Sequence, residues 1–141
     1  MFKFEPVSQL DRAILEILLA TEARGESLEG QAAVVWTVLN RAEKPRWWGR
    51  TLREVMLKKW QYEGLQTIQE KPMKSVLSIP AALRKTVRQT QREIVGLVLD
   101  GWMSDPVGGA THYHAASVSP EWAKTLPHIR TIGGHRFFLE G

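Results

Sequence analysis

Apolar residues recur at helical spacing in the first third of the chain and predict two consecutive helices. The first covers residues 8–22, and Ser8 followed three residues later by Asp11 gives it an N-cap pattern. The second runs from about Ser27 to Ala42. The inward positions of the first helix are Leu10, Ile14, Ile17, Leu18 and Thr21, and those of the second are Ala32, Val35, Trp36 and Leu39.

The middle of the chain predicts further helices. Residues 51–54 form a capping box that opens a third helix to about Trp60, and a loop with one helical turn then extends to Ser78. Pro80, near a first helical position, predicts a long helix to about Trp102. Its expected buried residues are Leu83, Val87, Ile94, Leu97 and Val98, and its basic outer side carries Arg84, Lys85, Arg88 and Arg92.

After the glycines at 108 and 109 the pattern favours strands. Residues 110–115 predict a short strand, residues 119–121 a helical turn, and residues 129–139 a hairpin around Gly133 and Gly134. The pattern as a whole predicts one α+β domain over residues 1–141, mainly helical, with a small β-hairpin element near the C-terminus.

Composition restricts the chemistry that the chain can perform. There are no cysteines, which excludes disulfides and a thiolate nucleophile. The net charge of +4 suits a polyanionic partner, such as nucleic acid, anionic lipid or an anionic cell wall. The first residues lack the basic and apolar regions of a signal peptide, and no apolar stretch is long enough to cross a membrane. We therefore expect no signal peptide and no stable membrane insertion.

Glu22 is the candidate catalytic acid. It falls at the C-terminal end of the first predicted helix, where the helix dipole disfavours a carboxylate. Apolar neighbours would raise its pKa and keep it protonated, as a general acid requires. The alternative is a solvated surface residue, which is the usual role of a glutamate at a helix end. Glu26 and Glu29 are typical of first-turn acids of the next helix.

Four blocks of sequence together resemble one known family. They are TEARGESLEGQAAVVWTVLNR at 21–41, WQY at 60–62, GGATHYHAASVSPEWAKTL at 108–126 and IGGHRFF at 132–138. In this order they resemble the SleB-type cell wall hydrolases, the family of spore-cortex-lytic enzymes and several phage lysins. The resemblance covers nearly the whole chain. It implies a lysozyme-like domain that cleaves peptidoglycan between N-acetylmuramic acid and N-acetylglucosamine, with Glu22 as the catalytic acid and Glu26 in reserve.

The resemblance also implies substrate-binding residues and a reaction type. The implied substrate-binding residues are Gln61, Tyr62, Thr111, His112, Tyr113 and Trp122. Only one acid matches, whereas glycoside hydrolysis normally uses two carboxylates. We therefore expect a lytic transglycosylase, in which the muramyl C6 hydroxyl closes a 1,6-anhydro ring. A hydrolytic muramidase stays possible with Glu26 as the second acid or base.

Other interpretations of the sequence remain open. His112 and His114 share one face of a strand, and His128 or His135 could complete a zinc site of an amidase. No H-E-x-x-H motif accompanies them, and the family resemblance requires no metal, so we expect no cofactor. A peptidoglycan-binding module without catalysis is another alternative, and a nucleic-acid binder rests on charge alone.

The tryptophans and the cellular setting give the last expectations. Trp36 and Trp102 are expected in the core, whereas Trp47 and Trp48 cannot both be buried in a turn flanked by Pro and Gly, so at least one should face solvent or a cleft. Such a ring could stack on a sugar or, less favourably, dip into a membrane interface. We expect a monomeric phage endolysin that accumulates in the host cytoplasm before its release to the wall.

Overall fold

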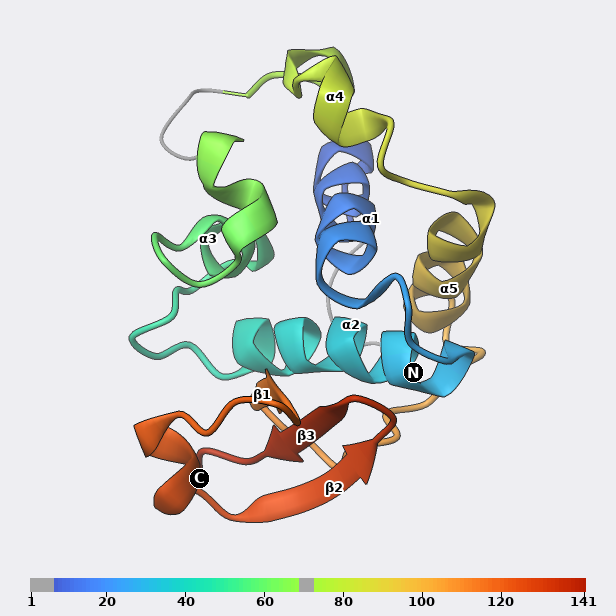
Figure 1. Ribbon diagram of the computed structural model, residues 1–141. Helices are drawn as coiled ribbons and strands as arrows, with labels where there is room; N and C mark the ends of the chain where they lie inside the picture. The colour runs from blue at the N-terminus through green and yellow to red at the C-terminus, as the bar shows by residue number, and fades with distance from the viewer. Residues whose placement is uncertain (1–6, 69–72) are drawn as a thin grey trace.

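The computed structural model describes residues 7–68 and 73–141, in which helices lie above a small antiparallel sheet (Figure 1). The α-helices are α1 (Gln9–Ala23), α2 (Leu28–Glu43), α3 (Leu52–Leu57), α4 (Ala81–Arg84) and α5 (Gln89–Leu99). Short 3₁₀ helices occur at Glu63–Ile68, Val76–Ser78 and Glu121–Lys124. The strands are β1 (His112–Ala115), β2 (His128–Ile132) and β3 (His135–Phe138), in the order β1-β3-β2.

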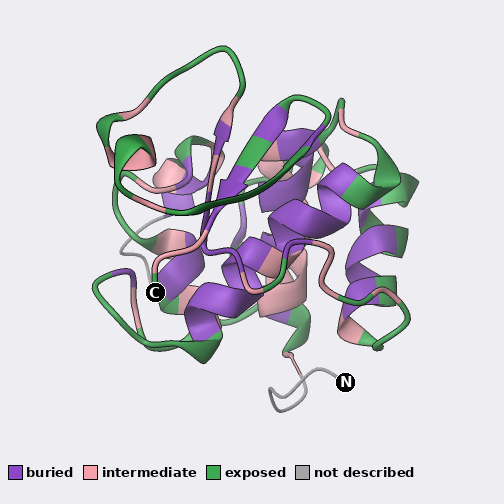
Figure 2. Cartoon of the chain, turned by 90° about the horizontal axis from the view of Figure 1, so that it is seen from below, coloured by how far each residue is buried: buried purple, intermediate pink, exposed green. Residues whose placement is uncertain are grey.

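Helices α1 and α2 confirm the first two predicted helices. The Ser8 hydroxyl accepts from the Asp11 N–H at 3.0 Å, and the Ser27 hydroxyl accepts from the Gly30 N–H at 3.1 Å. Helix α2 lies between α1 and the sheet (Figure 1). The buried stretches of the helices lie behind the sheet, and the loops around it are largely exposed (Figure 2). None of the helices in residues 7–68 and 73–141 has both the length and the apolar character that a membrane span needs.

The middle of the chain differs from the prediction. Helix α3 ends at Leu57, before Trp60, because Lys58 leaves the helical region at ψ 127°. The expected single helix from Pro80 to Trp102 is wrong: it is divided into α4 and α5. The predicted loop before it contains two 3₁₀ helices, and its residues 69–72 lie outside the described part of the chain.

A side chain from a distant helix explains the division. Arg88 is extended, and its backbone N–H donates to Gln91 Oε1 at 2.9 Å, which starts α5 anew. The amide of the same glutamine donates to Gln31 Oε1 of α2 at 3.1 Å in a buried contact. A buried amide must find partners, so this contact fixes where α5 begins.

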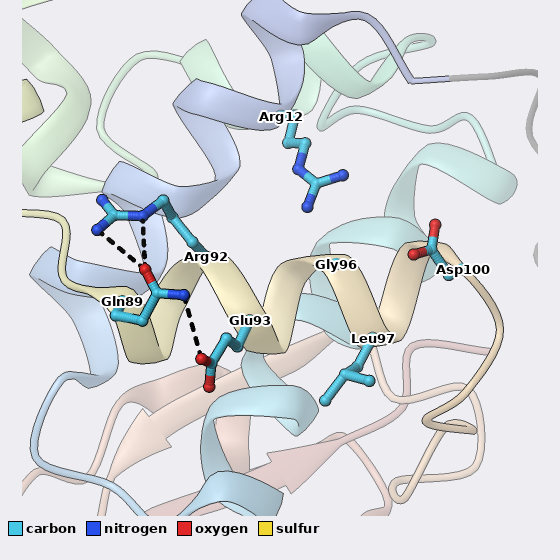
Figure 3. Close-up of a pocket in the computed structure, with 7 residues that line it drawn as sticks. All are labelled: Arg12, Gln89, Arg92, Glu93, Gly96, Leu97 and Asp100. Carbon is cyan, nitrogen blue, oxygen red and sulfur yellow. Dashed lines mark hydrogen bonds between the residues drawn. The ribbon is translucent and has the colours of Figure 1, made fainter.

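The expected buried face of α5 also needs correction. Ile94 and Val98 are buried, but Leu97 is 42% exposed and Val95 takes the inward place instead. Leu97 lines a shallow pocket on the outer side of α5, toward which Arg12 of α1 extends (Figure 3). Trp102 is not a core residue either, since it is 79% exposed.

The C-terminal part confirms the predicted strands. Strands β2 and β3 form a hairpin that turns at Gly133, whose φ of +55° suits glycine. Strand β1 pairs with β3, so that β1 forms an outer edge of the sheet. Phe137 of β3 is fully buried in the main core. Strand β1 carries His112, Tyr113 and His114, which the sequence analysis singled out.

Candidate active site

A cleft of about 380 Å³ lies where the edge strand β1 meets the end of α1 and the segment 60–62. Its lining residues are Glu22, Arg41, Trp47, Trp60, Gln61, Tyr62, His112, Tyr113, Trp122 and Glu140. The pocket outside α5 is larger, about 520 Å³, but three of its polar side chains bind one another: Gln89 donates to Glu93 and accepts from Arg92 (Figure 3). The chemistry therefore points to the smaller cleft.

Glu22 lies in the last turn of α1 and projects into the cleft. The Tyr113 hydroxyl donates to its Oε1 at 2.5 Å. Burial raises the pKa of Glu22, and the negative charge of Glu63 adds to the rise, while the bond from Tyr113 opposes it. The carboxyl is thereby held closer to the protonated state than an exposed glutamate, which is the condition for a general acid.

Two tyrosines that line the cleft with Glu22, Tyr113 and Tyr62, stay uncharged. Burial and the neighbouring Glu22 carboxylate raise the pKa of Tyr113 well above its ordinary value. Burial likewise raises the pKa of Tyr62, which is almost fully enclosed. Both hydroxyls remain donors across the physiological range, so Tyr113 can stabilise Glu22 whenever that carboxyl loses its proton.

Arg41 connects the two walls of the cleft. Its Nε donates to the Thr111 carbonyl beside β1 at 2.6 Å, and its Nη1 donates to Gln61 Oε1 at 2.9 Å. Its guanidinium also lies over the rings of Trp47 and Trp48. Because Gln61 Oε1 is occupied, the side-chain NH₂ of Gln61 is the group left to donate to a ligand. Arg41 was not predicted as a site residue, although a charged residue on the inward face of a helix indicates a buried polar contact.

Thr111 supports His112 from behind. The Thr111 hydroxyl accepts from the Glu140 N–H at 3.0 Å and lies 3.0 Å from His112 Nδ1. We infer that it gives its own proton to Nδ1, which leaves the hydrogen of the neutral ring on Nε2. Burial, together with the positive charge of Arg41, lowers the pKa of His112 to about 4. The structure thus places His112 in the cleft and Thr111 beneath it, almost fully buried.

Aromatic rings form much of the cleft wall. Trp48 is fully buried and its indole N–H donates to the Arg41 carbonyl, while Trp47 is half exposed and lines the cleft. The expectation that at least one of these two rings faces solvent or a cleft is confirmed. Trp122 also lines the cleft, with its ring centroid 5.0 Å from that of His112. Trp60 lines it too; it lies in the family-like block 60–62 but was not predicted as a site residue.

Glu26 does not line this cleft. Its Oε1 accepts from the Gly134 N–H at 2.9 Å, and the side chain packs against the turn of the hairpin. The second carboxylate in the cleft belongs to Glu140 instead, whose Oε1 lies 3.8 Å from His112 Nε2. No pattern in the sequence pointed to Glu140, since it follows the last strand without a motif of its own.

The histidines do not assemble as the zinc hypothesis requires. His112 and His114 share one face of β1, and both rings contact Trp122. However, His114 Nδ1 donates to the Ala115 carbonyl, and His128 pairs with Thr131. Within residues 7–68 and 73–141, no three histidine, aspartate or glutamate side chains are grouped closely enough to hold a metal ion.

Comparison with known proteins finds a relative of similar sequence. The chain is 29% identical over 117 residues to a spore cortex-lytic enzyme of Halalkalibacterium halodurans. The matched region covers 82% of this chain and 31% of that enzyme. The chain thus spans about a third of the length of this relative.

Two solved structures resemble this chain in fold. The catalytic domain of the germination-specific lytic transglycosylase SleB from Bacillus anthracis matches with a TM-score of 0.74 and 26% identity, over 96% of this chain and 98% of that one. The catalytic domain of the Bacillus cereus SleB protein matches with a TM-score of 0.71 and 26% identity, over 96% and 94% of the two chains. The lysozyme-like α+β fold expected from the sequence is confirmed. The sequence profile of the cell wall hydrolases matches residues 25–138, and the chain therefore belongs to the cell wall hydrolase family.

Proposed function

We propose that this chain degrades peptidoglycan as a lytic transglycosylase that cleaves the β-1,4 bond between N-acetylmuramic acid and N-acetylglucosamine. The observation that carries the proposal is Glu22, a carboxyl with a raised pKa at the base of an aromatic-walled cleft. The profile match begins just after this residue, so its role rests on the geometry and on the TEARGE motif. Support for the substrate comes from the relatives, a spore cortex-lytic enzyme and a lytic transglycosylase.

The reaction needs one acid that acts twice. Glu22 first gives its proton to the glycosidic oxygen as the bond from that oxygen to muramyl C1 breaks. The resulting carboxylate, stabilised by the Tyr113 hydroxyl, then takes the proton of the muramyl C6 hydroxyl. The C6 oxygen bonds to C1, which closes the 1,6-anhydro ring without consuming water. Glu22 ends the cycle protonated, as it began.

The polar groups around Glu22 suit the sugar substituents. The Gln61 NH₂ and the His112 Nε2–H are donors in the cleft, and both are oriented by neighbouring residues. N-acetyl and lactyl oxygens are acceptors that such donors would hold. Trp47 and Trp122 line the same cleft beside His112, with ring centroids 6.2 Å and 5.0 Å from that of the histidine, and an indole ring suits the apolar face of a pyranose. These residues would position the strand, and Glu22 would act on the bond.

A hydrolytic muramidase is the second candidate, and Glu140 favours it. This carboxylate lines the same cleft as Glu22. A glycosidase with two carboxylates can use the second one to activate water or to form a covalent intermediate. In this alternative the role first considered for Glu26 passes to Glu140.

Product analysis distinguishes the two reactions. Purified peptidoglycan digested by the protein should yield muropeptides that end in 1,6-anhydro-N-acetylmuramic acid, measured by mass spectrometry after borohydride treatment. Glu140→Gln should leave this product unchanged, because no second carboxylate takes part. If reducing muramyl ends predominate and Glu140→Gln abolishes them, the protein is a hydrolase. Reducing glucosamine ends would show that the wrong bond has been assigned.

We also propose that the chain acts as a monomeric phage endolysin, which accumulates in the host cytoplasm before it reaches the wall. Its net charge of +4 supports attraction to an anionic cell wall. Expression inside a bacterial host should leave cells intact until the inner membrane is permeabilised, and turbidity should then fall. Rapid lysis without permeabilisation would contradict this part of the proposal.

A further inference from the structure

Trp60 has an unusual backbone for a large residue. Its φ of +70° makes it the one non-glycine residue with a positive φ in the described part of the chain. The left-handed region is unfavourable for bulky side chains, so the surrounding structure must hold the residue there. Gln66 does so from both sides, since its Oε1 accepts from the Trp60 N–H at 3.1 Å and its Nε2 donates to the Tyr62 carbonyl at 2.8 Å.

Core packing does not explain this conformation. The Trp60 side chain is 80% exposed and takes no part in the hydrophobic core. Its ring nevertheless lines the cleft, directly before Gln61 and Tyr62, which line it more deeply. Lys59 places its Nζ 5.3 Å from the ring centroid and is the one cation that lies over this ring within residues 7–68 and 73–141. Strained backbone that presents a side chain outward is typical of binding sites.

We propose that Trp60 is the stacking platform for an outer sugar of the glycan strand, at the mouth of the cleft on the wall formed by residues 60–62. This inference rests on the proposed function and adds a subsite to it. The broad indole face suits the axial C–H groups of a pyranose, and it is the most exposed aromatic surface in the cleft. The turn held by Gln66 sets the angle of the ring before substrate arrives, so that little side-chain order is lost on binding.

The chain offers a matched control in Trp102. This residue is 79% exposed, nearly the same as Trp60, but it does not line the cleft. A loss of affinity caused by removing any exposed indole would affect both residues equally. A loss confined to Trp60 identifies a subsite.

Trp60→Gly is the sharpest variant, because glycine adopts a positive φ without strain. We expect the half-saturating concentration of soluble glycan strands to rise roughly tenfold, with kcat within about threefold of the wild type. The melting temperature should stay the same or rise. Trp60→Phe, which keeps a smaller ring, should give an intermediate value, and Trp102→Ala should behave as the wild type does. An unchanged half-saturating concentration in Trp60→Gly would overturn the inference, whether or not the melting temperature falls.

Binding measured without cleavage separates this inference from the proposed reaction. Sedimentation with insoluble peptidoglycan can compare Glu22→Gln with the double variant Glu22→Gln, Trp60→Gly. Weaker sedimentation of the double variant supports the subsite even if the wild type shows no cleavage, in which case the proposed reaction fails alone. Equal sedimentation of the two variants rejects the subsite even if the reaction is as proposed.

Discussion

Two glutamates, four residues apart in one motif, belong to different regions of the molecule. Glu22 ends α1 and faces the cleft, where its partner is a side-chain hydroxyl of the edge strand β1. Glu26 lies in the loop before α2 and reaches the turn between β2 and β3, where its partner is the backbone N–H of Gly134. The comparison shows that one stretch of sequence supplies both the proposed catalytic acid and a hydrogen bond that links the hairpin to the helices.

The difference follows from what each carboxyl contacts. Glu22 is partly enclosed, and burial raises its pKa although the hydrogen bond from Tyr113 opposes the rise. Glu26 is packed against Gly133 and Gly134, so closely that a Cβ on Gly133 would lie 2.6 Å from Glu26 Oε1. Held against this turn, Glu26 does not line the cleft. Contact, and not residue type, thus separates the two glutamates, and the proposed function assigns the reaction to the one in the cleft.

Glu22→Gln should give the largest effect. We expect a loss of wall-lytic activity of about 10²- to 10⁴-fold, because the amide has no proton to transfer. The fold should be retained, since Gln Oε1 can still accept from the Tyr113 hydroxyl. Turbidity clearance and thermal melting measure the two properties. Activity within a few-fold of the wild type would remove Glu22 from the mechanism.

Glu26→Ala should affect stability and not chemistry. We expect the free energy of unfolding to fall by about 1–2 kcal/mol, because the Gly134 N–H loses its carboxylate acceptor. Activity per folded molecule should change less than about threefold. Glu26→Gln is the control, since it keeps an acceptor oxygen and should lose less stability. A hundredfold loss of activity with unchanged melting would instead make Glu26 a catalytic residue.

A double-mutant cycle between Gly133 and Glu26 should show their direct coupling. Gly133→Ala suffers from a φ of +55° and from the Glu26 oxygen at 2.6 Å, and Glu26→Ala removes the second cause. We expect a coupling of about 0.5–1 kcal/mol in denaturant unfolding. Gly108→Ala is a matched control, since its φ is +54° and the nearest atom to its Cβ would be 3.9 Å away. Additive effects would show that Glu26 moves aside at no cost.

The smallest effect concerns how the titration of two cleft residues makes the stability of the protein depend on pH. Burial raises the pKa of Glu22, so its contribution to stability is complete below the unfolded pKa and is lost as pH rises through the folded pKa. Burial lowers the pKa of His112 from 6.5 to about 4, so its contribution is present above pH 6.5 and is lost as pH falls toward 4. Glu22→Gln should therefore raise the melting temperature at pH 8 relative to the wild type, but not at pH 4. His112→Gln should flatten the decline between pH 6.5 and 4. Equal shifts at both pH values would contradict this assignment.

Local signals in the sequence predicted much of the fold. Ser8 and Ser27 mark helix starts through hydrogen bonds within three residues, and the paired glycines at 133 and 134 predict a hairpin. The break before α5 could not be predicted in this way. It depends on a contact between Gln91 and Gln31, sixty residues apart, and a helical period carries no information on such a pair.

The candidate site likewise contains residues that local motifs predicted and residues that only long-range contacts bring in. The family-like blocks pointed to Gln61, His112 and Tyr113, which the structure brings together with Glu22. Arg41 and Glu140 were missed because their roles arise only where α2 and the chain after β3 meet the cleft. Long-range packing, which no motif encodes, completes the wall.

The bridge made by Arg41 has a consequence for the rate of substrate capture. One guanidinium holds Gln61 on one wall and the Thr111 carbonyl on the other, so the cleft cannot widen unless one of these hydrogen bonds breaks. The walls are thus arranged when the chain folds, and a glycan strand meets a surface that needs no rearrangement. Binding should then follow a single exponential whose rate grows in proportion to substrate concentration, without a plateau from a slow opening step.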